Sequence, residues 1–484
     1  MHRHEPSNHA FANFHPRVRE GLCVSNRRGM LKAGLAGMAG LNLPTLLQAR
    51  EQAIQQGESL GKKSVILLWM AGGPSQIDTW DPKPERPVEN RGPFQSIDSA
   101  IPGVSISEHL PKQAVLLDRF TIIRSVDCRN SDHSPGKVMQ TGNREASPRK
   151  NPQGDLYPAM GSVVAKFHGP NQPGMPPYVA FNRDPNHIPG GGHIGMRYDS
   201  MNGHRAAGLP DYQGFGRLTA RDAETSQAVR FTLPESVSIQ WLQERRSLLQ
   251  SFDQLRSEID RSGAMDALDH FQQQAVEMVL GGRAQAAFDL SRVPQKEQAR
   301  YGKQLWCQQA LLARRLIEAG TAFVTIDLSM GINAGDWDSH GDQHVFGGIS
   351  TGLKPLLPIF DHLITTLVED LEERGMLDDV LILAMGEFGR SPVIGTQKGF
   401  SGGRNHWPRV MSMCVAGGGL NHGRVIGSSN TEGGEIRNHP VNPGDLAATI
   451  YTHMGVPLDS TYTDAAGRPR FIVEGDGRSI AEIG

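Results

Sequence analysis

The chain has 484 residues, enough for one large domain or two to three ordinary ones, and its 49 lysines and arginines nearly balance its 51 aspartates and glutamates. Because this balance creates no long-range field for nucleic acid or an anionic membrane surface, we expect neither as a partner. The 56 glycines and 31 prolines predict many turns and a loop-rich design.

The first 49 residues contain, in order, the features of an export signal. Residues 25–32 resemble a twin-arginine signal, residues 33–47 form a moderately apolar stretch, and the small residue Ala49 follows. This stretch is too short and too rich in glycine to span a bilayer comfortably, and an ordinary basic helix start is the alternative interpretation. We therefore predict a signal peptide over residues 1–49 and a periplasmic or extracellular mature chain without a transmembrane span.

Apolar runs and helical periodicity alternate along residues 50–484. Continuous apolar runs between polar flanks, typical of buried parallel strands, predict strands over residues 63–70, 120–126, 178–181, 321–328 and 379–385, with shorter runs at 410–416 and 423–427. Helical periodicity covers residues 235–280, 296–319, 353–373 and 443–454. Gly320 and Pro443 supply an end signal and a start signal for two of these helices.

This alternation predicts a single domain of the α/β class. We expect a three-layer α/β/α structure around a mostly parallel, doubly wound sheet. Residues 235–300 would form a helical excursion from it. In such sheets the side chains that follow the carboxyl ends of the strands build the active site, so polar clusters after strands are the first candidates for function.

Asp338 and His340 follow the predicted strand at 321–328. Because they are two residues apart, both side chains can point the same way from an extended loop and hold one metal ion. A solvated polar turn is the alternative, since Asp, Ser and Gly are common turn residues.

Glu387 and Arg390 follow the predicted strand at 379–385. The carboxylate of Glu387 would lie where a metal or substrate binds, and the planar guanidinium of Arg390 matches a tetrahedral anion such as phosphate or sulfate. A plain ion pair between the two side chains is the alternative.

His406 lies in a third polar cluster with Arg404, after a glycine-rich loop at 399–403. Histidine is the commonest metal ligand, so we predict that His406 binds a metal or an anion, although a lone loop histidine is more often a surface residue.

Ser134 and His133 follow the predicted strand at 120–126. Pro135 suits the first turn of a helix, so Ser134 would be its N-cap, at the positive end of the helix dipole. Beside a metal ion such a serine can lose its proton and attack phosphorus. His133 is a second candidate ligand or base, and simple capping is the alternative for Ser134.

Asp78 is the carboxylate nearest to the end of the predicted strand at 63–70. The Gly-Gly-Pro turn at 72–74 lets the backbone approach a ligand closely, so we include Asp78 among the candidate ligands. Stabilising its own turn is the alternative role.

Taken together, these clusters resemble domain-of-unknown-function family 1501, a branch of the alkaline phosphatase and sulfatase superfamily. The resemblance covers nearly the whole mature chain and is carried by residues 72–84, 337–342, 386–392, 403–408 and 423–427. It implies an alkaline-phosphatase-like sheet with a two-metal site at its carboxyl edge. It also implies Ser134 in the position of the nucleophile, Asp338 and His340 as ligands of one metal, Glu387 in place of the usual Asp, and His406 as the late histidine.

This chain departs from the superfamily pattern at two positions. Residues 70–72 (Met-Ala-Gly) stand where the aspartate after the first strand would be, and Phe388 stands where a histidine would follow the acid. These departures imply fewer ligands and motivate an alternative function. No cysteine lies in the sequence context of a formylglycine, which disfavours that form of sulfatase chemistry.

We therefore predict an exported metal-dependent hydrolase of phosphate or sulfate esters, with Ser134 or metal-bound water as the nucleophile. The metal is expected to be zinc, manganese, calcium or magnesium, and the substrate a small-molecule or polysaccharide ester. Arg390 and Arg404 would stabilise developing charge. The alternative is a catalytically degenerate binding protein on the same scaffold, outside the cytoplasm. The complete predicted metal-ligand set is Asp78, Asp338, His340, Glu387 and His406.

Overall fold

A computed structural model describes residues 62–131, 137–181, 187–209, 282–329, 337–341, 347–395, 402–473, 475 and 477–483. The predicted signal peptide, the helical pattern at 235–280, and both Ser134 and His133 lie outside the described residues. The chain divides into two compact units, one formed by Lys63–Ser460 and Ile472–Gly484 and the other by Met1–Lys62 and Thr461–Phe471.

An eight-stranded sheet forms the centre of the larger unit, with the strand order β12-β4-β11-β8-β1-β7-β5-β6. Every neighbouring pair is parallel except the two pairs that include β11, which runs antiparallel to both β4 and β8. The predicted mostly parallel sheet is therefore confirmed. In chain order the strands are β1 (Ser64–Trp69), β4 (Phe120–Val126), β5 (Tyr178–Phe181), β6 (Met201–Asn202), β7 (Phe323–Asp327), β8 (Val380–Met385), β11 (Met411–Gly417) and β12 (Arg424–Ile426).

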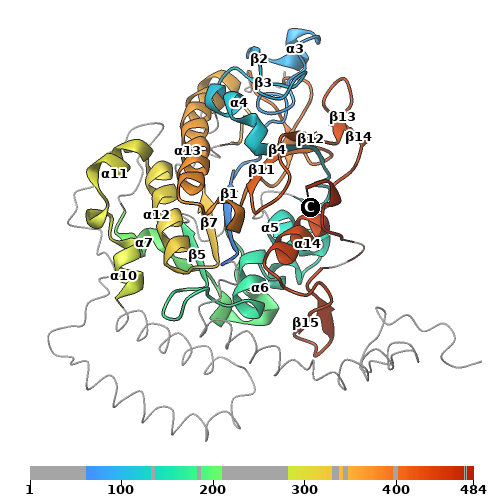
Figure 1. Ribbon diagram of the computed structural model, residues 1–484. Helices are drawn as coiled ribbons and strands as arrows, with labels where there is room; N and C mark the ends of the chain where they lie inside the picture. The colour runs from blue at the N-terminus through green and yellow to red at the C-terminus, as the bar shows by residue number, and fades with distance from the viewer. Residues whose placement is uncertain are drawn as a thin grey trace, which may run out of the picture. The chain divides into compact units, whose positions relative to one another are not determined.

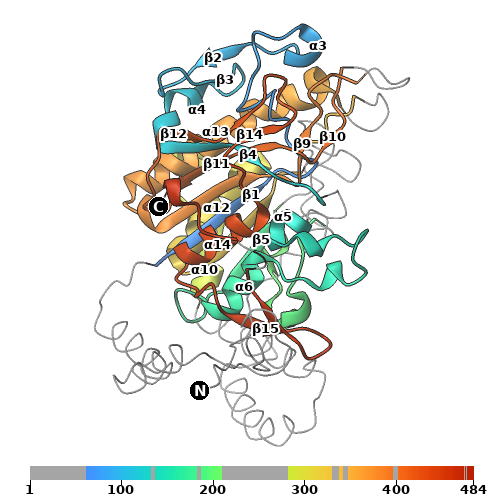
Figure 2. The same ribbon diagram turned by 90° about the vertical axis from the view of Figure 1, so that its right-hand side faces the viewer.

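Helices cover both faces of this sheet, as Figures 1 and 2 show from two directions. On one face lie α4 (Pro111–Val115), α12 (Leu305–Ala319) and α13 (Lys354–Glu373), and on the other lie α5 (Lys137–Thr141), α6 (Met160–Phe167) and α14 (Pro443–His453). Alternate residues of β1, such as Ile66 and Leu68, pack in one hydrophobic cluster with α12 and α13. The three-layer α/β/α arrangement is thus confirmed.

The strand register brings several carboxyl ends to one edge of the sheet. Trp69 at the end of β1 is level with Asp327 at the end of β7 and with Met385 at the end of β8. Because β11 is antiparallel, it begins at this same edge, where Met411 pairs with Val126 of β4. The segment that leads into β11 therefore meets the loops that follow β1, β7 and β8.

The periodic pattern at 296–319 corresponds to two helices rather than one. Helix α11 (Gln295–Tyr301) ends at Gly302, whose φ of 89° breaks the helix before α12 begins. Gly320 ends α12 with a φ of 117° in the left-handed region that favours glycine, as predicted. Helix α14 starts with Pro443 and is capped by Asn442, whose side chain accepts a hydrogen bond from the backbone of Asp445.

The remaining helices and strands are short. In the larger unit they are α3 (Val88–Arg91), β2 (Ser96–Asp98), β3 (Ser105–Ser107), α7 (Gly203–Ala207), α10 (Arg283–Phe288), β9 (Gly389–Arg390), β10 (His406–Trp407), β13 (Ser428–Ser429) and β14 (Ile436–Asn438). The smaller unit contributes the hairpin of β15 (Thr461–Thr463) and β16 (Pro469–Phe471). Across the described part of the chain, no helix combines the length and the apolar character needed to cross a membrane.

Candidate metal centre

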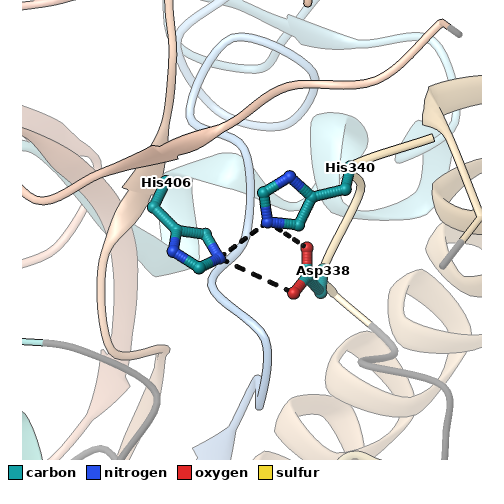
Figure 3. Close-up of side chains that lie close together, drawn as sticks. All are labelled: Asp338, His340 and His406. Carbon is teal, nitrogen blue, oxygen red and sulfur yellow. Dashed lines mark hydrogen bonds and ion pairs between the residues drawn. The ribbon is translucent and has the colours of Figure 1, made fainter. Parts of the chain in front are cut away.

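Three potential metal ligands converge at the carboxyl edge of the sheet: Asp338, His340 and His406 (Figure 3). The Nε2 atoms of the two histidines are 2.8 Å apart, and the Asp338 carboxylate lies 3.4 Å from His340 Nε2 and 3.7 Å from His406 Nε2. Among the residues that the structure describes, this is the one group of three or more His, Cys, Asp or Glu side chains with converging ligand atoms.

The distances among these atoms fit a divalent cation. In a tetrahedral zinc site with bonds of about 2.0–2.2 Å, neighbouring ligand atoms lie about 3.3–3.6 Å apart. Asp338 Oδ1 lies 3.4 Å from His340 Nε2 and Asp338 Oδ2 lies 3.7 Å from His406 Nε2, so each oxygen is near this spacing from one imidazole. The two imidazole nitrogens, at 2.8 Å, would have to move apart to bind one cation. Without a cation the same pair can share one proton in a hydrogen bond.

The protonation state of His340 also suits a ligand. The pKa of His340 is lowered to about 4, chiefly by burial and also by Arg390 and His406, against the opposing effect of the Asp338 carboxylate. The imidazole is therefore neutral at pH 7, which leaves a nitrogen lone pair for a metal ion.

Trp337 fixes the backbone from which Asp338 extends. Its indole is fully buried, donates a hydrogen bond to the Leu328 carbonyl at 3.1 Å, and stacks on Trp306 with ring centroids 6.1 Å apart. Its backbone N–H donates to the Ala71 carbonyl at 3.1 Å. The loop after β7 is thus attached to the end of β1, next to the residue that carries the carboxylate.

Gly72 allows the two loops to approach this closely. A Cβ atom at position 72 would lie 2.4 Å from the backbone nitrogen of Asp338, and the residue has a φ of 110°. A side chain is therefore excluded both by the contact and by the backbone conformation.

Arg390 orients the Asp338 carboxylate. Its Nη1 lies 2.7 Å from Asp338 Oδ1, and its guanidinium also donates to the backbone carbonyls of Gly72, Gly73 and Arg404. Because the Arg390 side chain is 0% exposed, these contacts favour a positioning role. A direct contact with a substrate anion stays a prediction.

Glu387 lies at the same edge but outside the group of three converging ligands. It is buried, and its Oε1 accepts a hydrogen bond of 2.8 Å from the backbone N–H of Gly72. This bond joins the ends of β8 and β1, and a ligand role for Glu387 stays a prediction.

Asp78 and Arg404 are bound to each other. Arg404 Nε lies 2.7 Å from Asp78 Oδ2, and Ser75 donates its hydroxyl to the same oxygen at 2.5 Å. The guanidinium of Arg404 also donates to backbone carbonyls, among them that of Asn90 at 2.7 Å. The structure does not bring Asp78 into the group of converging ligands. These contacts favour a structural role for the pair, and the predicted ligand and charge-stabilising roles stay predictions.

His406 is held by a short antiparallel pairing of β10 with β9, in which it lies opposite Arg390. Its ring contacts that of Phe388, with centroids 4.8 Å apart, and that of His340, with centroids 4.5 Å apart. The side chain is 41% exposed, so the group of three ligands is open to solvent on the side of His406.

One further carboxylate–imidazole pair at this edge was not predicted from the sequence. Asp327, the last residue of β7, is buried, and its Oδ2 lies 2.9 Å from Nδ1 of His187. An acid that ends a run of buried residues was a usable signal for Asp327. Nothing in its neighbourhood distinguished His187, because its partner lies 140 residues further along the chain.

Comparisons with known proteins give one family. The model of a family described as a protein of unknown function (DUF1501) matches residues 62–483. A search of curated protein sequences finds no match.

Comparison with solved structures finds several similar proteins. A sulfatase from Pseudoalteromonas sp. is 12% identical, over 84% of this chain and 70% of that one, with a TM-score of 0.34. A phosphonate monoester hydrolase from Silicibacter pomeroyi is 13% identical, over 77% of this chain and 71% of that one, with a TM-score of 0.31. A phosphonate monoester hydrolase of Agrobacterium radiobacter is 14% identical, over 86% and 76%, with a TM-score of 0.28.

Proposed function

The chain belongs to the DUF1501 family, and from that premise we propose that it is a metal-dependent hydrolase of phosphate or sulfate esters that acts outside the cytoplasm. The observation that carries this proposal is the convergence of Asp338, His340 and His406 at the carboxyl edge of a mostly parallel sheet. Twin-arginine export is part of the proposal and is supported by the sequence of residues 25–47.

Two imidazole nitrogens and one carboxylate oxygen suit zinc or manganese better than calcium or magnesium, which prefer oxygen ligands. A cation bound there supplies Lewis acidity, which polarises the ester and favours ionisation of the nucleophile. His340 contributes a neutral nitrogen, and Arg390 keeps the Asp338 carboxylate directed at both histidines. The exposed side of His406 leaves room for a substrate, which we propose to be a small-molecule or polysaccharide ester.

The proposed nucleophile is Ser134, with His133 as a candidate base. Its support is the position in the chain: Ser134 lies between β4, which ends at Val126 at the carboxyl edge, and α5, which begins at Lys137. Attack by a serine hydroxyl requires that its proton be removed, and both a neighbouring base and a cation favour this.

Metal analysis combined with an ester assay tests the proposal. The purified protein, reconstituted separately with Zn²⁺ and Mn²⁺, is expected to retain metal and to hydrolyse nitrophenyl phosphate or nitrophenyl sulfate. His340→Ala and His406→Ala should lose both properties. His439→Asn is the matched control, because His439 is exposed and is not part of the group of three ligands. Retention of metal and rate in the two site variants would contradict the proposal.

A catalytically degenerate binding protein is the second candidate function. The ion pair between Asp78 and Arg404 favours this candidate. Asp78 is the acid nearest the first strand and Arg404 is one of the two arginines proposed to stabilise charge, and each is bound to the other. This candidate predicts that ligand is captured without turnover, and that Ser134→Ala leaves any residual hydrolysis unchanged.

A further inference from the structure

The Asp327–His187 pair lies at the same edge of the sheet as the candidate metal centre but shares no residue with it. We propose that it is an acid–base dyad that transfers protons during ester hydrolysis. This inference rests on the proposed function, and it gives roles to two residues outside the predicted ligand set.

The geometry of the pair fixes which imidazole nitrogen carries the proton in the neutral ring. Asp327 Oδ2 lies 2.9 Å from His187 Nδ1, and the Asp327 side chain is 0% exposed whereas that of His187 is 32% exposed. An ionised carboxylate only accepts hydrogen bonds, so Nδ1 carries a proton and Nε2 of the neutral ring is the basic nitrogen. A buried acid that holds one nitrogen of a partly exposed imidazole is an arrangement that suits general acid–base catalysis.

Both members of the dyad are held by the fold. Asp327 is the last residue of β7 and is level with Trp69 in the central strand β1. The backbone carbonyl of His187 accepts a hydrogen bond of 2.6 Å from the Gln140 side chain, which belongs to α5. The backbone of His187 is thus held by α5 and its ring by the end of β7, and a ring held in this way needs less reorganisation to transfer a proton.

Glu387 lies at the same edge of the sheet as the dyad and the candidate metal centre. Strand β1 separates β7 from β8, and Glu387 follows β8. Its charge acts on Asp327 on one side and on Arg390, the partner of Asp338, on the other. Burial raises the pKa of Asp327 and the charge of Glu387 adds to this, whereas the hydrogen bond from His187 lowers it. The carboxylate is therefore most stable beside a protonated imidazole.

The proton transfers balance over one turnover. The ionised nucleophile bonds to phosphorus or sulfur as the bond to the alcohol oxygen breaks, and that oxygen takes the bonding electron pair and a proton from Nε2 of the protonated His187. The neutral ring then accepts a proton from water as the water oxygen bonds to phosphorus or sulfur and the nucleophile leaves with the electron pair of its bond, again ionised. The net reaction is ester plus water to alcohol plus phosphate or sulfate, and the dyad returns to its first state.

The dependence of rate on the leaving group tests the dyad. A poor leaving group such as phenol needs a proton, whereas the more acidic nitrophenol leaves as an anion. His187→Gly and Asp327→Asn should therefore lower kcat for phenyl phosphate or phenyl sulfate by about 10²–10⁴-fold, with a much smaller effect on the nitrophenyl ester. Added imidazole should restore part of the lost rate in His187→Gly.

Two controls keep this test specific. His193→Gln alters a histidine six residues further along the chain from His187, whose ring contacts that of Tyr157, and its rates should match those of the wild-type protein. Metal content and thermal unfolding are measured for every variant, and the dyad variants should retain the metal and remain folded.

The outcomes separate the two proposals. An equal loss for both esters, or loss of the metal in His187→Gly, would overturn the dyad and make the pair a structural or ligand element. An unchanged protein that binds metal but hydrolyses neither ester would instead overturn the proposed function, and the dyad with it.

Discussion

At the residue scale, the candidate site depends on the contacts of one buried carboxylate, that of Asp338, with an arginine and two histidines. Asp338 faces the guanidinium of Arg390 at 2.7 Å and the two imidazoles at 3.4 and 3.7 Å. The arginine compensates the buried charge and also fixes its direction.

Replacing Arg390 should be costly even without substrate. In Arg390→Met, Asp338 keeps its charge in a buried position, so we expect a loss of about 3–5 kcal/mol in the free energy of unfolding. Arg409→Met is the matched control, because Arg409 and Glu435 form an exposed pair with side chains 58% and 49% exposed. That control should lose at most about 1 kcal/mol. Denaturant unfolding measures the free energy of unfolding of both variants. An Arg390→Met protein as stable as the wild-type protein would contradict the role of Arg390 in compensating the buried charge of Asp338.

His340 should make the metal-free protein less stable in acid. Its pKa is about 4 in the folded protein against 6.5 for an ordinary histidine, because burial disfavours the charged ring. The unfolded chain therefore takes up a proton that the folded chain excludes, and stability falls as the pH drops from about 6.5 to about 4.

His340→Gln removes this contribution. In chelator, the loss of stability between pH 7 and pH 5 should be smaller in His340→Gln by about 1 kcal/mol. His453, whose pKa burial also lowers to about 4, contributes equally to both proteins and cancels in the comparison. Identical pH dependence of unfolding in the two proteins would refute the assignment.

The sequence predicted part of this residue-scale picture. Asp338 and His340 were recognisable because they are two residues apart after a buried strand, and the structure brings both together with His406. Their role as ligands stays a prediction. The pairing of Asp78 with Arg404 was not predictable, because it depends on how segments 326 residues apart pack against each other.

At the scale of elements, the site is assembled by close contacts between loops. Backbone carbonyls of the loop after β1 accept hydrogen bonds from two other segments. The Ala71 carbonyl accepts from the backbone N–H of Trp337, and the carbonyls of Gly72 and Gly73 accept from the guanidinium of Arg390. These contacts hold the loop after β7 and strand β9 against the end of the central strand.

Gly72→Ala tests this assembly. The added Cβ would lie 2.4 Å from the Asp338 nitrogen at a φ of 110°, so we expect a loss of about 3 kcal/mol or more and weaker metal binding. Gly103→Ala is the control, since Gly103 has a φ of 75° and no atom within 4 Å of the added Cβ. It should lose only about 1–2 kcal/mol from strain and keep its metal affinity. Equal losses would show that strain alone explains the effect.

The bounds of two strands followed from the sequence. Those of β4 and β5 agree with the prediction, and each strand is a run of mostly buried residues. The break at Gly302 was not predicted, because the apolar spacing of α11 and α12 continues across it and only the positive φ separates them. Periodicity reports which face is buried, not whether the backbone is continuous.

At the scale of the whole molecule, the candidate site combines segments that are remote in the sequence. In the eight-stranded sheet, β11 runs antiparallel to both of its neighbours, so it begins at the edge where the parallel strands end. The chain must therefore return to that edge before β11, and it carries His406 there.

A cation that binds only the folded chain should stabilise the whole protein. At a free metal concentration of about 100 times Kd, the expected gain is about 2.7 kcal/mol, seen as a rise in the temperature of unfolding on adding Zn²⁺ and its reversal by chelator. The rise should be absent in His406→Ala and present in His439→Asn. An equal rise in all three proteins would indicate binding elsewhere on the chain.

The most direct measurement is the metal content of the purified protein after reconstitution with zinc or manganese, beside that of His340→Ala and His406→Ala. We predict a stoichiometric ion in the unchanged protein and a large loss in both variants. An unchanged protein that holds no more metal than the two variants would contradict the claim that Asp338, His340 and His406 form a cation site.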